Sequence, residues 1–385
     1  MALHVSPKWL AVEPTHGTQT RQRSAVRVRC TAQSSSAPAT SPSYEEGELE
    51  RPRWAGETPL SRIVAAIIEF KPLYSILKFG ARQVFISTAQ KKEIPWVEMR
   101  KQIMSSDVYK EKAAVEDPSL VYPDSVAVVS PNPMMRSMTP FSLKDYLKPF
   151  HAYDEGNLSW LAAAEAEPAT MSMALRAIPE ASSAEEANSV MRGNWLDAIK
   201  RHHLQFAKGC EIKDILDIGC SIGISTTFLV EKYPSAKVTG LDLSPYFLAV
   251  AQYKETRRPP RKNPIRWVHA NGESTGLSSA SFDLVSLAYV IHECPQRATI
   301  NLVKEAFRLL RPGGMIAITD NSPKSKKLQD LSPVLFTLMK STEPFLDEYY
   351  TLNLEETMRR VGFVNVQSLL TDPRHRTVTG TVLLS

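Results

Sequence analysis

Cysteine is scarce in this sequence of 385 residues and forms no pairing pattern. The four cysteines are Cys30, Cys210, Cys220 and Cys294, and none of them belongs to a Cys-x-x-Cys unit. Such units are typical of zinc sites and redox-active thiols. The sequence therefore indicates neither a zinc site nor a disulfide framework, and we expect no metal.

Long apolar runs are missing as well. No uninterrupted apolar stretch reaches the ~18 residues of a membrane-spanning helix, and the nearest candidate, residues 63–79, is broken by charged residues and Pro72. We expect no membrane span. Residues 61–87 alternate apolar and cationic side chains at helical spacing, with predicted interruptions at Pro72 and Gly80. They fit either a helix packed on the protein or an amphipathic helix on a membrane surface, so peripheral membrane contact stays open.

Acidic residues are nearly missing from the first 44 positions, where Glu13 is the only one beside five lysines and arginines. This segment is rich in Ser, Thr and Ala, and no compact apolar core follows its basic residues. Such a composition is typical of transit peptides rather than secretory signals. The sequence around Cys30 looks like a plastid processing site, which favours the chloroplast stroma. The alternative is a disordered N-terminal tail with no targeting function.

The charge of the remaining chain is nearly balanced. The formal net charge is +5, and the first 44 residues contribute five positive charges and one negative charge, or +4. The remainder is therefore near +1, which argues against nucleic acid as a partner. We expect a small-molecule substrate, while the oligomeric state stays open.

Residues 45–193 predict a helical N-terminal region with an irregular segment. Helical spacing continues over residues 94–112 and collapses at residues 118–149, which contain six prolines. Helical patterns return with an Ala-rich run at residues 161–166 and an amphipathic run at residues 191–206. We expect the main domain to begin at residue 194.

The most informative stretch is residues 213–232. An apolar run of strand length leads to Gly219 and Gly223, which bracket a turn before an amphipathic helix. Such a turn leaves backbone N–H groups free for a polar ligand. Ser221 stands where a dinucleotide-binding Gly-x-Gly-x-x-Gly turn needs its second glycine, and Asp217 would repel a pyrophosphate but accept from an ammonium group. The turn therefore favours a zwitterionic ligand.

A second strand-like run ends in Asp242, at the position from which a carboxylate reaches the hydroxyls of a bound ribose. With Asp217, Gly219, Gly223 and Asp242 in place, the chain resembles the class I S-adenosylmethionine-dependent methyltransferases over residues 194–385. It is similar, more loosely, to the branch that includes the C-methyltransferases of ubiquinone and menaquinone biosynthesis.

The resemblance implies an α/β fold with a Rossmann-like methyltransferase sheet. Seven strands are expected, the last one antiparallel, with helices on both faces and an N-terminal helical extension. The alternating strand and helix patterns from residue 213 onward fit this fold. The Leu-Leu-Arg-Pro-Gly-Gly sequence at 309–314 and the terminal strand patterns at 363–370 and 377–384 also fit. The expected domains are 1–44, 45–193 and 194–385.

The resemblance also implies S-adenosyl-L-methionine as cofactor. Asn271 and Gly272 match the turn that holds the adenine in the family, although a plain Asn-Gly turn explains them too. The expected cofactor-binding residues are Asp217, Gly219, Cys220, Ser221, Gly223, Asp242, Leu243, Asn271, Gly272 and Ala288.

Family members commonly cover the pocket with helices that precede the first strand. Tyr153 and Asn157 are therefore candidate substrate residues, and Tyr289 after the fourth strand is a third. A helix cap at Asn157 and an interdomain contact at Tyr153 are the alternatives.

Methyl transfer from a sulfonium displaces an activated leaving group, so orientation and electrostatics carry most of the catalysis. A hydroxyl or acidic carbon acceptor benefits from a general base of near-neutral pKa, for which His292 is the candidate. A structural histidine at a helix start is the alternative. The sequence thus predicts a methyltransferase for a small, unidentified plastid metabolite. A catalytically silent S-adenosylmethionine-binding partner and a nicotinamide oxidoreductase are the other readings.

Overall fold

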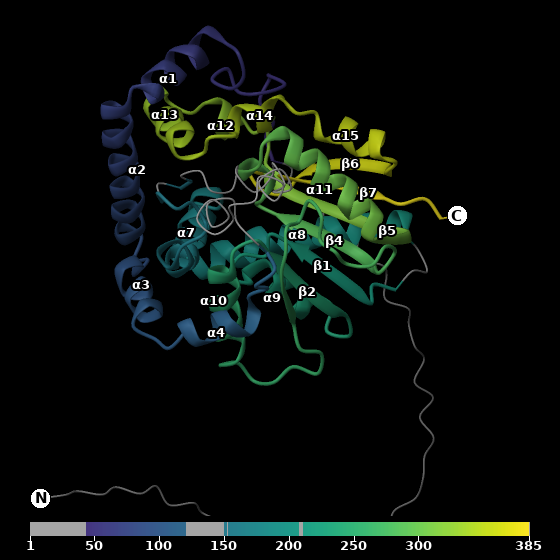
Figure 1. The fold of residues 1–385 in the computed structure, drawn as a ribbon. Coiled ribbons are helices and arrows are strands. Elements are labelled where there is room, and N and C mark those ends of the chain that lie inside the picture. The colour runs from purple at the N-terminus through teal and green to yellow at the C-terminus, as the bar shows by residue number, and fades with distance from the viewer. Residues whose placement is uncertain (1–43, 121–149, 152, 208–210, 385) are drawn as a thin grey trace, which may run out of the picture. The chain divides into compact units, whose positions relative to one another are not determined.

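The computed structural model describes residues 44–120, 150–151, 153–207 and 211–384. The expected transit peptide and nearly all of the irregular segment at 118–149 lie outside the described residues. Residues Ser43–Ser385 form one compact unit. Its centre is a seven-stranded sheet in the order β3-β2-β1-β4-β5-β7-β6 (Figure 1). The strands are β1 (Asp214–Ile218), β2 (Lys237–Asp242), β3 (Arg266–His269), β4 (Phe282–Ala288), β5 (Leu310–Asn321), β6 (Val364–Leu370) and β7 (His375–Thr381).

The direction of the strands confirms the expected fold. β1 to β5 run parallel to one another, and β7 runs antiparallel to both of its neighbours, β5 and β6. Parallel strands are buried on both faces and are therefore rich in apolar residues, as in β1, where Ile215, Leu216 and Ile218 are at most 2% exposed.

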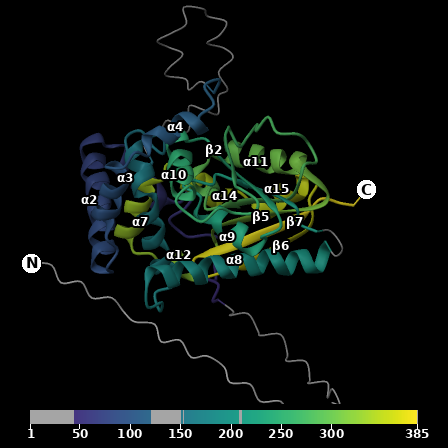
Figure 2. The same cartoon turned by 90° about the horizontal axis from the view of Figure 1, so that it is seen from below.

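Helices cover both faces of the sheet (Figure 2). Ile215 belongs to a cluster with side chains of α8 and α9, whereas Leu216 and Ile218 belong to a cluster with side chains of α11 and α15. The covering helices are α8 (Ala184–Phe206), α9 (Ile224–Lys232), α10 (Pro245–Glu255), α11 (Gln296–Leu309) and α15 (Leu354–Val361).

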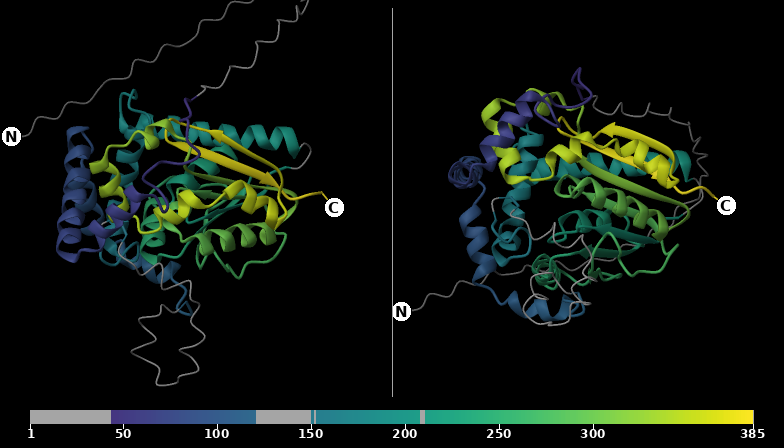
Figure 3. Two further views of the ribbon diagram at one scale, coloured as in Figure 1. Left: turned by 90° about the horizontal axis from the view of Figure 1, so that it is seen from above. Right: turned by 45° about the horizontal axis from the view of Figure 1, so that its top comes forward.

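A layer of further helices stands at one side of the sheet, where Figure 3 shows the N-terminal helices beside α7 and α13. α2 packs on α7 and α13, α3 packs on α7, and α4 packs on α10. The bounds are α1 (Pro59–Glu69), α2 (Lys71–Lys91), α3 (Trp96–Met104), α4 (Tyr109–Val115), α7 (Trp160–Ala177), α12 (Lys326–Gln329), α13 (Pro333–Thr342) and α14 (Leu346–Thr351).

One local expectation was wrong. Gly80 does not interrupt α2, because packing on two neighbouring helices outweighs the ~1 kcal/mol that a helical glycine costs. The Arg-Pro-Gly-Gly run lies inside β5, at a register shift opposite Phe282 and Leu284, where Gly313 has a φ of 79°.

The buried carboxylate of Glu165 joins α7 to α2 and α3. Glu165 has no exposed side-chain surface, and it accepts hydrogen bonds from Arg82 at 2.8 Å, Arg100 at 3.1 Å and the Tyr153 hydroxyl at 2.7 Å. Removing one partner of a buried ion pair leaves the other charges uncompensated. We expect Glu165→Ala to lower the free energy of unfolding by about 3–5 kcal/mol in urea titrations.

The exposed ion pair between Arg62 and Glu57 supplies a matched control, because both side chains are more than 70% exposed. Glu57→Ala should leave the urea midpoint unchanged, since exposed pairs contribute little. Equal midpoints for the two variants would show that Glu165 does not hold the layer.

Candidate functional site

A cavity of about 540 Å³ lies at the carboxyl ends of β1, β2 and β4. Open parallel sheets bind ligands at this edge, where the strand order reverses. Of the residues expected from the sequence, those that line the cavity are Tyr153, Asn157, Gly219, Cys220, Ser221, Asp242, Leu243, Asn271, Gly272, Ala288, Tyr289 and His292. Asp217 and Gly223 are not among the lining residues.

The turn after β1 requires its glycines. Gly219 has a φ of 71° and Gly223 a φ of 79°. A Cβ on Gly219 would meet Val290 at 2.5 Å, and one on Gly223 would meet Trp267 at 2.6 Å, both shorter than any normal contact. The packing and the positive φ of this turn therefore require glycine at both positions.

The backbone N–H groups of this turn were expected to be free for a ligand, but three of them are already hydrogen-bonded within the protein. Those of Gly219 and Cys220 donate to the carbonyl of Leu241 at 2.7 and 3.0 Å, and that of Ser221 donates to Asp242 Oδ2 at 2.7 Å. The protein itself uses all three, because β2 runs beside the turn. At this point the cavity is lined by the Gly219 backbone and, from β2, by the Asp242 carboxylate.

Asp242 ends β2 and lines the cavity with only 8% of its surface exposed. Its Oδ1 accepts from the Ser244 N–H at 2.8 Å. Burial raises the pKa of Asp242 to about 6, against the opposing effect of its backbone hydrogen bonds. The carboxylate is thus mainly ionised at neutral pH, and it suits ribose hydroxyls as an acceptor.

Asp217 lies beneath the turn rather than on the cavity wall. It is 1% exposed and accepts from Thr226 Oγ1 at 2.7 Å and from Ser286 Oγ at 3.0 Å. These bonds tie the start of α9 to β1 and β4. Burial raises its pKa to about 6.

Arg192 of α8 is a cavity residue that the sequence did not indicate. Its Nη1 donates to Ser225 Oγ at 2.6 Å, and its guanidinium lies 5.3 Å from the Tyr289 ring centre. Burial lowers its pKa, while Tyr289 and Asp217 act in the opposite direction. A cation therefore stands beside the glycine turn. No spacing rule links it to that turn, since α8 precedes β1 in the chain.

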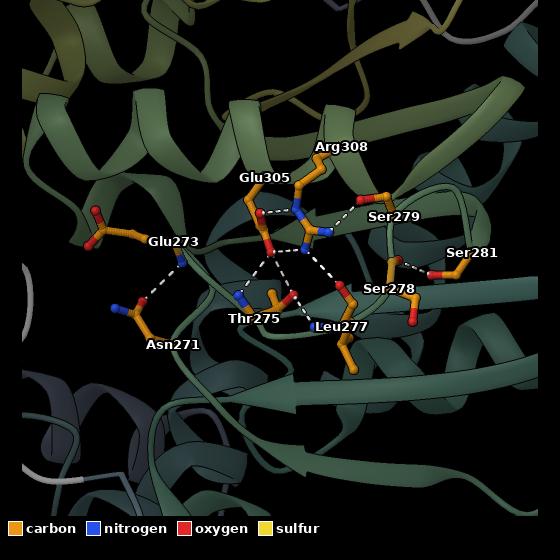
Figure 4. Close-up of polar contacts among 9 residues, drawn as sticks. All are labelled: Asn271, Glu273, Thr275, Leu277, Ser278, Ser279, Ser281, Glu305 and Arg308. Carbon is orange, nitrogen blue, oxygen red and sulfur yellow. Dashed lines mark hydrogen bonds and ion pairs between the residues drawn. The ribbon is translucent and has the colours of Figure 1, made fainter.

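The Asn271–Gly272 turn follows β3 and is anchored from behind. Asn271 Oδ1 accepts from the Glu273 N–H at 2.9 Å, as in a plain Asn-Gly turn. Further along the loop, Glu305 Oε1 accepts from the N–H and hydroxyl of Thr275 at 2.9 and 2.6 Å, and Arg308 donates to the Leu277 carbonyl at 2.8 Å (Figure 4). Helix α11 thus fixes the loop that presents this turn.

His292 lies in the short helix η2 (Ile291–Glu293) and is held by Asp320 at the end of β5. Its Nδ1 lies 2.8 Å from Asp320 Oδ1, and its backbone N–H donates to Oδ2 at 3.1 Å. Burial alone would lower the pKa of His292, but the charge of Asp320 raises it to about 10. The ring is therefore an imidazolium at neutral pH, not the near-neutral base that the sequence suggested.

Asn157 contacts this region instead of capping a helix. Ser159 caps α7 through its side-chain oxygen, which accepts from the Ala162 N–H. The Asn157 amide donates to Glu293 Oε2 at 2.7 Å. Burial raises the pKa of Glu293 to about 8, a value suited to proton exchange near neutrality.

The two tyrosines occupy different positions. The Tyr153 hydroxyl is bonded to Glu165, so this residue lines the cavity while holding the helical layer. Tyr289 has a φ of 62° and packs its ring against His375, with 5.1 Å between the ring centres. A bulky residue with positive φ costs about 1–3 kcal/mol and tends to occur at functional sites.

One group within the described ranges could hold a metal ion. Ligand atoms of His151, His292 and Glu343 all lie within 4.8 Å of one another. The cations around them oppose a dication. His292 is itself protonated, and Arg176 and Arg374 act on Glu343 closely enough to lower its pKa against the larger effect of burial.

Comparison with known proteins identifies the family. Residues 215–314 match the family model described as "Methyltransferase domain". The demethylmenaquinone methyltransferase of Lactococcus lactis is 31% identical over 200 residues, which cover 45% of this chain and 77% of that protein. The mitochondrial 2-methoxy-6-polyprenyl-1,4-benzoquinol methylase of Caenorhabditis elegans is 31% identical over 173 residues, which cover 39% of this chain and 60% of that protein.

Among solved structures, the apo form of the S-adenosylmethionine-dependent methyltransferase SibL covers 77% of each chain, with 17% identity and a TM-score of 0.38. The sequence relatives, the matched domain and the sheet order agree with one another. The chain therefore belongs to the class I S-adenosylmethionine-dependent methyltransferases, and its cofactor is S-adenosyl-L-methionine.

Proposed function

We propose that the protein methylates a small, largely apolar metabolite in the chloroplast stroma. One observation carries the proposal: the cavity that begins at the cofactor turn continues along a wall of apolar side chains. That wall includes Phe85, Met173, Leu338, Met339 and Phe345. The names of the two sequence relatives denote acceptors that are quinones or quinols, which supports an apolar acceptor here.

The residues at the glycine turn fit the cofactor. The Gly219 backbone lines the cavity without a side chain, and Asp242 presents a largely buried carboxylate for ribose hydroxyls. We propose Asn271 and Gly272 for the adenine, Arg192 for the methionine carboxylate, and Cys220, Ser221, Leu243 and Ala288 for the walls. When bound, S-adenosylmethionine supplies a methyl group on a sulfonium.

The acceptor side would then begin at His292. Its imidazolium can donate to an oxygen of the acceptor and stabilise negative charge that develops there. Asp320 fixes the orientation of the ring and keeps it protonated. Glu293 can take up the proton that a hydroxyl or acidic carbon loses.

Apolar side chains at the surface offer a route for such an acceptor. α1, α2 and α13 lie side by side (Figure 1) and carry the exposed residues Ile63, Ile76, Phe79, Val334 and Leu335. Leu335 also lines the cavity. None of the described helices is long and apolar enough to cross a bilayer. We propose that this face, the α1–α2–α13 face, touches a membrane surface, in addition to packing on the protein.

The triple variant Ile76→Ser, Phe79→Ser and Val334→Ser tests this contact. Burying one such side chain contributes about 1.5–3 kcal/mol, so the variant should lose at least tenfold in binding to vesicles of phosphatidylcholine and phosphatidylglycerol. Leu204 on α8 is similarly exposed, and Leu204→Ser should bind like the wild type. Equal co-sedimentation of all three proteins would exclude a membrane-binding role for this face.

The proposed function is tested with radiolabelled S-adenosylmethionine and a panel of acceptors. The panel pairs prenylated quinols and long-chain amphipathic acids with soluble phenols, short-chain carboxylic acids and peptides, and mass spectrometry of the products locates the new methyl group. We expect turnover with the apolar members and none with peptides. Turnover of soluble acceptors or peptides alone would refute the proposal.

A further inference from the structure

Two arginines face the cavity from opposite parts of the chain. Arg176 lies in the last turn of α7, and Arg374 lies between β6 and β7, and both line the cavity. Arg176 stacks over the Phe85 ring, 4.5 Å from its centre. Across the described part of the chain, no carboxylate lies within ion-pair distance of either guanidinium, and neither guanidinium donates a hydrogen bond.

This contrasts with other arginines of the sheet. Arg376, two residues after Arg374, is paired with Glu355 at 2.5 Å, and Arg311 is paired with Asp214 and Asp283 at 2.8 Å each. Arg374 is half-buried and Arg176 is exposed, and the protein neutralises neither guanidinium where it lines the cavity. Two unpaired arginines at one cavity are a common arrangement for recognising an anion.

The backbone that carries Arg374 is rigidly held. The Arg374 N–H donates to Asp372 Oδ1 at 2.8 Å, and its carbonyl accepts from the Ser322 N–H at 2.8 Å. Asp372 is also bonded to the His375 ring at 2.7 Å. The turn is thus built before any ligand binds, as expected for a binding residue rather than a mobile surface arginine.

Charges of both signs act on the two guanidiniums. The pKa of Arg176 is lowered to about 9, mainly by the protein that surrounds it and in part by the charge of Arg374, while Glu343 acts in the opposite direction. Burial lowers the pKa of Arg374, and Tyr350, Asp372 and Glu343 act in the opposite direction. His292 adds a third cation, which its partner Asp320 offsets. Burial raises the pKa of Glu343, and its Oε2 has no hydrogen-bond partner among the described residues.

We propose that Arg176 and Arg374 form a subsite for an anionic group, a carboxylate or a phosphate, on the methyl acceptor. The inference rests on the proposed function and specifies the substrate class: an amphipathic acid whose apolar body lies along Phe85 and Met339. Planar guanidiniums bind both oxyanions in a bidentate manner. The unpartnered Glu343 Oε2 can accept from a hydroxyl on the same acceptor.

Two other ligands compete for these arginines. The carboxylate of the cofactor is the first, but Arg192 already stands beside the glycine turn with its guanidinium bonded to Ser225. A metal ion on His151, His292 and Glu343 is the second, and the positive charge of His292 itself disfavours it. Both are therefore outcomes that the experiment has to separate.

The experiment compares wild-type protein with Arg176→Gln and Arg374→Gln, full chain in each case. Each protein is saturated with S-adenosylhomocysteine and titrated by calorimetry with octanoate, octyl phosphate, octanol and methyl octanoate. We expect the wild type to bind an anionic probe at least tenfold more tightly than the neutral ones. Each variant should lose at least tenfold for the anionic probes and keep its affinity for the neutral probes. The preferred anion separates a carboxylate from a phosphate.

Arg360→Gln, at an exposed position of α15, is the matched control and should match the wild type throughout. Equal wild-type affinity for octanoate, octyl phosphate and octanol would overturn the inference. A loss of S-adenosylhomocysteine affinity in either variant would instead assign the arginines to the cofactor. Tighter binding of Zn²⁺ or Mn²⁺ than of the anions would assign the cluster to a metal. If the wild type failed to bind S-adenosylhomocysteine, the cofactor site and proposed function would fail, whatever the anion selectivity.

Discussion

Asp242→Asn is expected to weaken binding of S-adenosylhomocysteine about a hundredfold in calorimetric titrations. The carboxylate accepts from the N–H groups of Ser221 and Ser244 and also presents an acceptor to the cavity. An amide has one oxygen and one NH₂ group, so it loses a charged acceptor for the ribose hydroxyls, and a hydrogen bond to a charged group contributes about 1.5–3 kcal/mol. A loss of ~2.8 kcal/mol corresponds to that hundredfold change.

The same carboxylate predicts a pH dependence. Its pKa is raised to about 6, so it becomes protonated as the pH falls through 6 and stops accepting from ribose hydroxyls. Wild-type affinity should therefore fall between pH 7 and pH 5, and Asp242→Asn should show no such fall. An affinity that rises on acidification would contradict the assignment of Asp242 to the ribose.

Asp217→Asn is the matched comparison, because this carboxylate has a similarly raised pKa but does not line the cavity. It should lower the free energy of unfolding by about 1–3 kcal/mol, since Thr226 and Ser286 lose a charged acceptor. Its affinity for S-adenosylhomocysteine should change less than that of Asp242→Asn. A larger affinity loss at Asp217 would mean that it contacts the methionine end directly.

His292→Gln should lower kcat by about 10²–10³-fold with an acceptor identified by the screen, while binding of S-adenosylhomocysteine stays unchanged. The reason is that the imidazolium faces the acceptor side and not the glycine turn. Asp320→Asn should lower kcat as well, because it removes the charge that keeps the ring protonated. A fall in cofactor affinity instead of kcat would place His292 at the cofactor rather than at the acceptor.

The pH dependence of kcat above neutrality shows whether His292 acts as an acid or as a base. The pKa of His292 is raised from 6.5 to about 10, so the ring stays protonated at neutral pH, and the stability that its ion pair contributes, complete below pH 6.5, is lost as the pH rises through 10. Asp320 is the main cause of the rise, and Glu343 and Glu293 contribute to it. If the imidazolium is needed, kcat falls as the pH rises through 10, and in Asp320→Asn the fall moves to lower pH. A kcat that rises through this range would identify His292 as a general base.

The local patterns of the sequence predicted the frame of the site because each depends on adjacent residues. Gly219 and Gly223 must be glycine to adopt positive φ in a crowded turn, and Asp242 follows the next strand at a fixed distance. The sheet order brings such strand ends to one edge whatever lies between them. The glycine turn, the acidic residue at the end of β2 and the seven-stranded sheet could therefore be predicted from the sequence.

The charged groups of the acceptor side could not be read in the same way. Arg176, Glu343 and Arg374 come from three separate segments, and an isolated arginine or acid is usually a surface residue. Only the fold brings them to one cavity, and only the fold sets Asp320 against His292. Their effect on His292 was equally hidden, because a partner 28 residues away sets its pKa. Asp217 is the opposite case. The sequence placed it in the cofactor site, but its two carboxylate oxygens accept from Thr226 and Ser286 and do not line the cavity.

A crystal structure of the full chain with S-adenosylhomocysteine tests the central claim most directly. The account predicts ribose oxygens within hydrogen-bond distance of Asp242, adenine against Asn271–Gly272, the carboxylate near Arg192, and the sulfur facing the part of the cavity that holds His292. A ligand whose carboxylate lies on Arg176 and Arg374 would contradict it, because the proposed acceptor subsite would then belong to the cofactor.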